Sequence, residues 1–189
     1  MAEDKHLLGY LGEYVSPGGS FYGGLLVTNE RGLPREFRHT DATRPSKLQV
    51  TLYGDQLHSC LGSDAMAPAL YNSLTEKPGV LQVDRMGKRF FGEFVGQISP
   101  AALLIAAPSD EGLFAESVSP LGDLVDFVRL DHLRVPNSFV FAYLVDDVGG
   151  NGRRILETAQ RQMNLYSPFD RIRTVLRQIA EMDEVRPRG

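Results

Sequence analysis

The stretch FVFAYLVDDVGGNGRRILETAQ, from Phe139 to Gln160, contains the clearest change of backbone pattern in the chain. Its first half, with Ser138 before it, is aromatic and β-branched, which is typical of a strand that spans a sheet. Its second half places Ile155 and Ala159 at helical spacing, so we expect a helix there. Two aspartates and three glycines lie between the halves. The stretch therefore predicts strand, turn and helix, and the turn is either a phosphate-binding loop or purely structural.

Strand patterns also dominate the chain before this stretch. The segments HLLGYLGEYV and FYGGLLVT read as strands, and NERGL between FYGGLLVT and PREFRHT predicts a hairpin. Pro34 cannot donate to a ladder, which favours an edge position for the strand that it begins. VLQVD, ALLIAA and the aromatic segment KRFFGEF also indicate strands.

Helical signals follow the hairpin and return at the carboxyl end. Ser46 and Gln49 match a capping box, which predicts a helix beginning there. Near the carboxyl end, apolar residues repeat at helical spacing after Pro168. We therefore expect an α+β protein with a mostly antiparallel sheet, an N-terminal hairpin, a helical insertion at about 46–76, and a C-terminal two-helix unit packed on the sheet. A single globular domain over 1–189 is expected, with the last few residues frayed.

Composition excludes several classes of protein. The chain has 189 residues, is 42% apolar and 23% charged, and carries a net charge of −4, as expected for a globular protein. It has one cysteine, Cys60, which rules out an internal disulfide framework and favours a reducing, cytoplasmic environment. No apolar run is long enough to span a membrane, and no secretory signal is visible, so we expect no membrane partner.

Familiar catalytic and cofactor motifs are absent from the sequence. It contains no Walker loop, no dinucleotide fingerprint between a strand and a helix, and no nucleophile elbow. His58 and Cys60 are two residues apart on an expected helix, where their side chains diverge, and zinc needs about four converging ligands. We therefore expect no metal site, no cofactor and no catalytic residues, and the sequence leans against an enzyme.

The glycine-rich turn is the candidate ligand site. Free amides at a helix N-terminus suit a phosphate, and neighbouring arginines add charge-assisted donors. The candidate residues are Asp146, Asp147, Gly149, Gly150, Asn151, Gly152, Arg153 and Arg154. The segment YLVDDVGGNGRRIL resembles the phosphoribosyltransferase signature. The resemblance implies that the two aspartates contact a ribose and that the loop amides hold its 5-phosphate. The alternative is a solvated turn in which Asn151 or Gly152 supplies an unusual φ.

Two further patterns suggest partners. From Arg153 to Gly189 the chain has eight arginines and five acidic residues, a local excess of three positive charges (8 − 5), which could contact nucleic-acid phosphates. Aromatic residues beside glycine and basic residues suggest an interface, because adjacent aromatics in a strand point to opposite faces. The alternative is a strand that is buried on both faces. The candidate partner-binding residues are Tyr22, Phe90, Phe91, Arg173 and Arg177.

The preferred hypothesis at this level is a small cytoplasmic binding or adaptor protein, or a subunit of a larger assembly, without catalytic activity. It rests on the missing catalytic motifs and on strands whose edges could pair with a partner. One alternative is an enzyme or sensor that binds a nucleotide or sugar phosphate at the 146–154 loop. A third is a nucleic-acid accessory protein that uses the C-terminal arginines. A protein partner is expected before a nucleic acid, and a homo-oligomer stays open.

Overall fold

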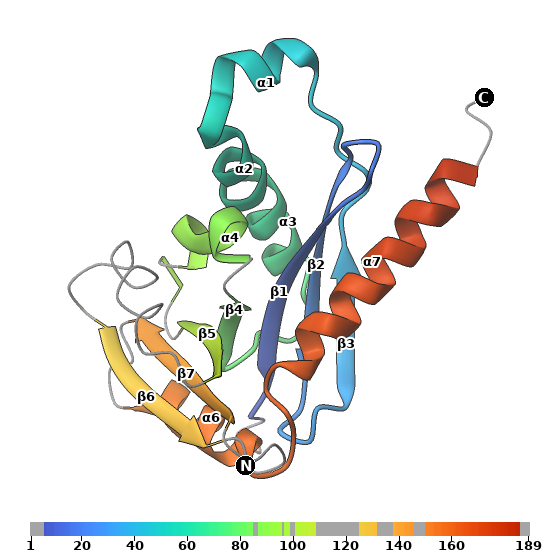
Figure 1. Ribbon diagram of the computed structural model, residues 1–189. Coiled ribbons are helices and arrows are strands. Elements are labelled where there is room, and N and C mark those ends of the chain that lie inside the picture. Colours follow the sequence, from blue (N-terminus) through green and yellow to red (C-terminus); the bar gives the residue numbers. More distant parts are fainter. Residues whose placement is uncertain are drawn as a thin grey trace.

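A computed structural model describes residues 6–84, 87–95, 97–98, 101–108, 125–131, 138–145 and 150–185 (Figure 1). Seven strands form one sheet in the order β3-β2-β1-β4-β5-β7-β6. The strands are β1 (Leu8–Val15), β2 (Phe21–Thr28), β3 (Pro34–His39), β4 (Val80–Asp84), β5 (Ala101–Pro108), β6 (Val125–Asp131) and β7 (Ser138–Val145). β4 is parallel to both of its neighbours, β1 and β5, and the other four pairings are antiparallel. The expected α+β fold with a mostly antiparallel sheet is confirmed.

The hairpin formed by β2 and β3 follows from its turn residues. The side-chain oxygen of Asn29 accepts hydrogen bonds from the backbone N–H groups of Arg31 and Leu33, both at 3.0 Å. Gly32 takes a φ of 75°, a conformation that favours glycine. Pro34 begins β3, which lies at the edge of the sheet and needs no donor on its outer side.

The helical insertion begins at the predicted capping box and leads back to β4. Its elements are α1 (Lys47–Tyr53), the short 3₁₀ turn η1 (Gly54–Gln56), α2 (Leu57–Ser59), the π-helical segment η2 (Cys60–Met66) and α3 (Ala67–Asn72). Ser46 and Gln49 exchange the expected side-chain-to-backbone hydrogen bonds, at 3.2 and 2.8 Å. None of the residues of α1 is buried, and Figure 1 shows this helix standing away from the sheet. The predicted insertion is confirmed, although Leu48 and Leu52 are exposed and not part of the core.

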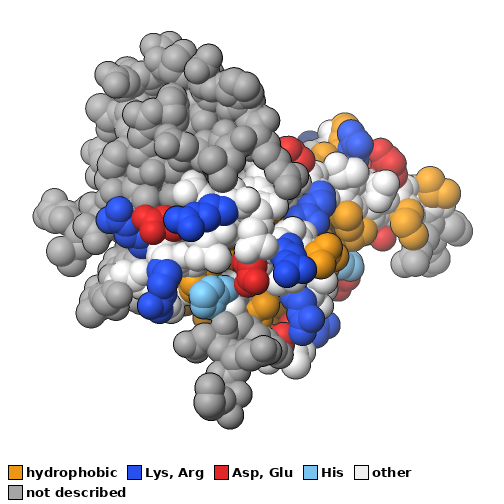
Figure 2. Space-filling model, turned by 90° about the horizontal axis from the view of Figure 1, so that it is seen from below, with side chains coloured by type: hydrophobic (Ala, Val, Ile, Leu, Met, Phe, Trp, Pro, Cys, Tyr) orange, Lys and Arg blue, Asp and Glu red, His pale blue; other side chains and the backbone are white. Residues whose placement is uncertain are grey.

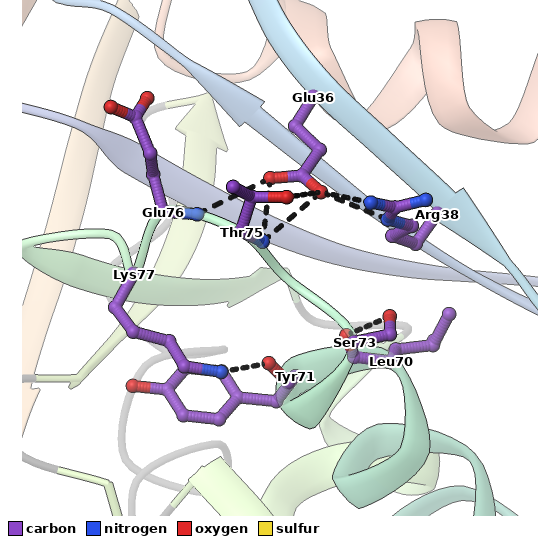
Figure 3. A network of polar contacts seen from close by, with 8 residues as sticks. All are labelled: Glu36, Arg38, Leu70, Tyr71, Ser73, Thr75, Glu76 and Lys77. Carbon is purple, nitrogen blue, oxygen red and sulfur yellow. Dashed lines mark hydrogen bonds and ion pairs between the residues drawn. The ribbon is translucent and has the colours of Figure 1, made fainter.

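A polar network ties the end of the insertion to the edge strand (Figure 3). The Glu36 carboxylate on β3 accepts hydrogen bonds from the backbone N–H groups of Thr75 and Glu76 and from the Thr75 hydroxyl. The Arg38 guanidinium donates to the same carboxylate at 2.6 Å. Burial alone would raise the pKa of Glu36, but these donors outweigh burial and lower the pKa.

The aromatic segment expected as a strand is instead the helix α4 (Gly87–Val95). Phe90, Phe91 and Val95 are buried together, because neighbouring residues on a helix are only about 100° apart and can share one broad face. The α4 backbone approaches η2 so closely that a Cβ on Gly62 would lie 2.0 Å from the Phe90 carbonyl oxygen. Packing at this contact therefore overrides the β propensity of the two phenylalanines.

Helices cover both faces of the N-terminal part of the sheet (Figure 1). One face packs on α6 (Asn151–Gln160) and α7 (Ser167–Val185), and its core includes Tyr10, Leu156 and Phe169. The other face packs on α3 and α4, and its core includes Leu11, Leu70 and Phe91. The expected C-terminal two-helix unit on the sheet is confirmed. Among the described helices, none is long and apolar enough to span a membrane.

Candidate functional site

The described half of the glycine-rich turn bonds to its own helix. Asp146, Asp147 and Gly149 lie outside the described residues. Gly150 has a φ of 68° just before α6, and its carbonyl oxygen accepts the Arg154 N–H at 3.1 Å. Gly152 is buried in the first turn of α6.

The arginines at the start of α6 also contact their own helix. Arg153 pairs with Glu157 at 2.8 Å, and Arg154 donates to the side-chain oxygen of Asn151 at 2.8 Å. These contacts do not test ligand binding at 146–154, so the phosphate site implied by the phosphoribosyltransferase resemblance stays a prediction.

The aromatic residues expected at an interface lie in the core. Tyr22, Phe90 and Phe91 are all buried. Tyr22 faces the α6 and α7 side of the sheet, whereas both phenylalanines face the α3 and α4 side. Of the two interpretations left open by the sequence, an exposed ring or burial on both faces, the structure favours burial, because helices cover both faces of the sheet.

Two of the described C-terminal arginines are engaged in contacts within the chain. Arg171 is half-buried and donates to the Gly32 carbonyl oxygen at 3.0 Å, and Arg173 is paired with an aspartate of the sheet. Arg177 is exposed on α7. The face in Figure 2 carries many Lys and Arg side chains, with acidic side chains among them. Arg171 and Arg173 are therefore held by the protein itself, and of the three arginines only Arg177 is exposed.

The structure brings together a different set of charged groups in the centre of the sheet. Glu13 lies near the carboxyl end of β1, and Asp84 is the last residue of β4, which runs parallel beside it. Glu13 is only 6% exposed and Asp84 only 1%. Ligand sites in open sheets commonly lie at the carboxyl ends of neighbouring parallel strands.

Gly87, the first residue of α4, allows the two carboxylates to approach each other. A Cβ at this position would lie 3.3 Å from Asp84 Oδ1 and 3.4 Å from Glu13 Oε2. The Gly87 N–H donates to Asp84 Oδ1 at 2.7 Å. Glu13 Oε2 is buried and has no hydrogen-bond partner among the described residues. A buried acceptor without a donor is costly, so its position calls for a functional explanation.

Arg173 from α7 supplies the positive charge of the site. Its guanidinium forms an ion pair and hydrogen bond with Asp84 Oδ2 and lies 3.8 Å from Asp170 Oδ1. The Arg173 side chain is 22% exposed, so it is the part of the site nearest to solvent. We name Glu13, Asp84 and Arg173 the carboxylate–arginine site.

Glu13 is electrostatically unusual. Its pKa is raised from 4.5 to about 7, mainly because the group is buried; the negative charge of Asp84 acts in the same direction, and Arg173 opposes both. A carboxyl group with a pKa of about 7 exchanges its proton near neutral pH. Strongly shifted groups of this kind concentrate at functional sites.

Sequence reasoning missed this site because its members are far apart in the chain and form no motif. One weak signal was present. Glu13 shares a strand face with the buried Leu11 two residues earlier, so an acid stood at an inward position. Asp84 ends an otherwise apolar strand. Nothing local, however, links either acid to Arg173.

A divalent cation does not fit the site as it stands. Many enzymes that cleave phosphate esters hold such ions between carboxylates. Here both oxygens of Asp84 already have donors, from Gly87 and Arg173, whereas Glu13 Oε2 is buried without a donor among the described residues. Among the described residues, no group of three or more Asp, Glu, His or Cys side chains could hold a metal.

The comparisons with known proteins identify a fold but no family. No family model matches the chain, and no curated protein matches its sequence. The structure of human ENDOV is similar, with a TM-score of 0.51 and 12% identity over 96% of this chain and 87% of that one. The catalytic domain of human endonuclease V has a TM-score of 0.49 and 14% identity, over 98% of this chain and 86% of that one. Endonuclease V of Ciona intestinalis, in complex with DNA that contains an inosine, has a TM-score of 0.48 and 10% identity, over 93% of this chain and 87% of that one.

The likeness to human ENDOV contradicts the expected adaptor or assembly subunit without catalytic activity, and that expectation is wrong. It rested on missing local motifs. That argument fails here because the groups that could carry chemistry come from β1, β4 and α7 and meet only in the folded chain.

Proposed function

We propose that the chain is a nucleic-acid-processing enzyme that hydrolyses phosphodiester bonds at the carboxylate–arginine site. One observation carries the proposal: two buried carboxylates and one arginine meet at the carboxyl ends of neighbouring central strands. Buried charges destabilise a fold unless they are fully paired, so their retention favours a functional role.

The class of substrate is inferred from the fold and from the charge of the site. The fold is shared with human ENDOV, an endonuclease by name, and we infer a nucleic-acid substrate from it. A guanidinium is also well suited to a phosphate, because its planar donors can bind two phosphate oxygens at once. Arg173 is the more exposed member of its ion pair and is the group that an entering phosphate would meet first.

Each residue has a distinct role in the proposed reaction. In hydrolysis, the water oxygen bonds to phosphorus while the bond to the leaving oxygen breaks; the water loses a proton and the leaving oxygen gains one. Glu13, with a pKa of about 7, can take up or release such a proton near neutral pH. Arg173 offsets the negative charge of the phosphate, and Asp84 positions the guanidinium.

The test is cleavage of labelled oligonucleotides. Single-stranded and duplex DNA and RNA are incubated with the wild type and with Glu13→Gln, and the products are separated on denaturing gels. We expect the wild type to cut at least one substrate and Glu13→Gln to cut it on the order of 100-fold more slowly.

Glu93→Gln on the exposed side of α4 is the matched control, and its rate should equal that of the wild type. Far-UV circular dichroism confirms that each variant is folded. A wild type that leaves all four substrates intact contradicts the proposal, and so does a folded Glu13→Gln variant with the wild-type rate.

A further inference from the structure

The unusual feature of the carboxylate–arginine site is that its cation belongs to the protein. Asp84 and Glu13 form a pair of acids around Gly87, an arrangement that would attract a positive ion. The Arg173 guanidinium lies against Asp84 Oδ2, where such an ion would otherwise bind. We propose that Arg173 takes the place of a divalent cation and excludes one from the Glu13–Asp84 pair.

Several contacts hold Arg173 in this position. Asp84 cannot turn away freely, because its other oxygen accepts the Gly87 N–H at 2.7 Å. Asp170, one turn earlier on α7, lies 3.8 Å from the second terminal nitrogen of Arg173. Ile172 and Leu176 on either side of Arg173 are buried against the sheet, so the helix itself is fixed. The guanidinium is therefore placed by the Asp84 side chain, which the Gly87 N–H of α4 holds, and by the packing of α7 on the sheet.

Electrostatics makes the exclusion effective. When both carboxylates are ionised, the two carboxylates and the guanidinium have a net charge of only −1. A divalent ion would also have to enter at close range to the fixed positive charge of Arg173. Magnesium also demands near-octahedral oxygen coordination, whereas both oxygens of Asp84 already accept hydrogen bonds from the protein. Removing the arginine should therefore create a cation site from the acids that remain.

The proposal takes its site from the proposed function, but its test measures cation binding and not cleavage. Mn²⁺ is added to the full chain at about pH 8, above the pKa of about 7 of Glu13, and free Mn²⁺ is measured by electron paramagnetic resonance. We expect the wild type to leave the free Mn²⁺ signal unchanged. We expect Arg173→Gln to bind Mn²⁺ at least ~10-fold more tightly than the wild type.

Two further variants assign the bound ion to the site. Arg177→Gln, which removes an exposed arginine one turn along α7, should behave as the wild type. Adding Asp84→Asn to Arg173→Gln should abolish the new Mn²⁺ binding.

The proposal is overturned if the wild type binds Mn²⁺ and Asp84→Asn removes that binding, because the ion then displaces the arginine. A folded Arg173→Gln variant that binds no Mn²⁺ also overturns it. If Arg173→Gln does not fold, the wild-type measurement and its Asp84→Asn control still decide. Loss of the proposed cleavage activity would leave each of these results unchanged, so the two proposals fail separately.

Discussion

Replacing Glu13 by glutamine should make the protein more stable at alkaline pH while removing its proposed activity. The pKa of Glu13 rises from 4.5 to about 7 on folding, mainly through burial. Below about pH 4.5 the group is protonated in both states, and its contribution to stability is fully present. Between about pH 4.5 and 7 the unfolded chain releases the proton while the folded chain keeps it, so stability falls as pH rises.

The size of the effect follows from the rise of roughly 2.5 in pKa, at about 1.36 kcal/mol for each pH unit. The wild type should therefore lose about 3 kcal/mol of unfolding free energy through Glu13 between about pH 4.5 and 8. The glutamine of Glu13→Gln cannot ionise, so this variant should not lose that unfolding free energy. Against a typical total stability of about 5–15 kcal/mol, a difference of this size is readily measured.

The assay is urea denaturation followed by far-UV circular dichroism, at a series of pH values from about 5 to 8. The free-energy difference between Glu13→Gln and the wild type should grow steadily with pH and level off above about pH 7. A constant offset from the amide does not affect this slope. The exposed Glu93→Gln should give a curve parallel to the wild type. Parallel curves for Glu13→Gln as well would refute the reasoning, because Glu13 would then titrate alike in both states.

Three other substitutions test the fold. Gly62→Ala should lower the free energy of unfolding measured in urea by about 3 kcal/mol or more, because its Cβ would lie 2.0 Å from the Phe90 carbonyl oxygen. Gly92→Ala, whose Cβ would have no contact closer than 3.5 Å, should lower it far less. Ser46→Ala should remove about 1 kcal/mol of helix capping and so speed amide hydrogen exchange in α1. The stability of the whole protein should stay almost unchanged, because no residue of α1 is buried, and a global loss of stability would contradict this exposed position. Glu36→Gln should lower stability by about 1–2 kcal/mol at neutral pH, with the difference from the wild type vanishing in acid; a difference that persists in acid would show that the carboxylate charge is not responsible.

Local sequence determined the secondary structure wherever one residue type has one physical role. Asn29 and Gly32 set the β2–β3 turn, Pro34 marked the edge strand, and Ser46 with Gln49 began α1. These features depend on contacts between residues a few positions apart, so a linear pattern contains all the information that they need.

Contacts between distant elements decided what the sequence could not. The aromatic pair at Phe90 forms a helix because the α4 backbone packs on Gly62, nearly thirty residues earlier, and β propensity alone pointed the other way. The candidate site arises in the same manner. The sequence shows Glu13 and Asp84 only as acids in apolar strands, and Arg173 only as one of several arginines. The parallel pairing of β1 with β4, and the packing of α7 across them, make these three charges one site.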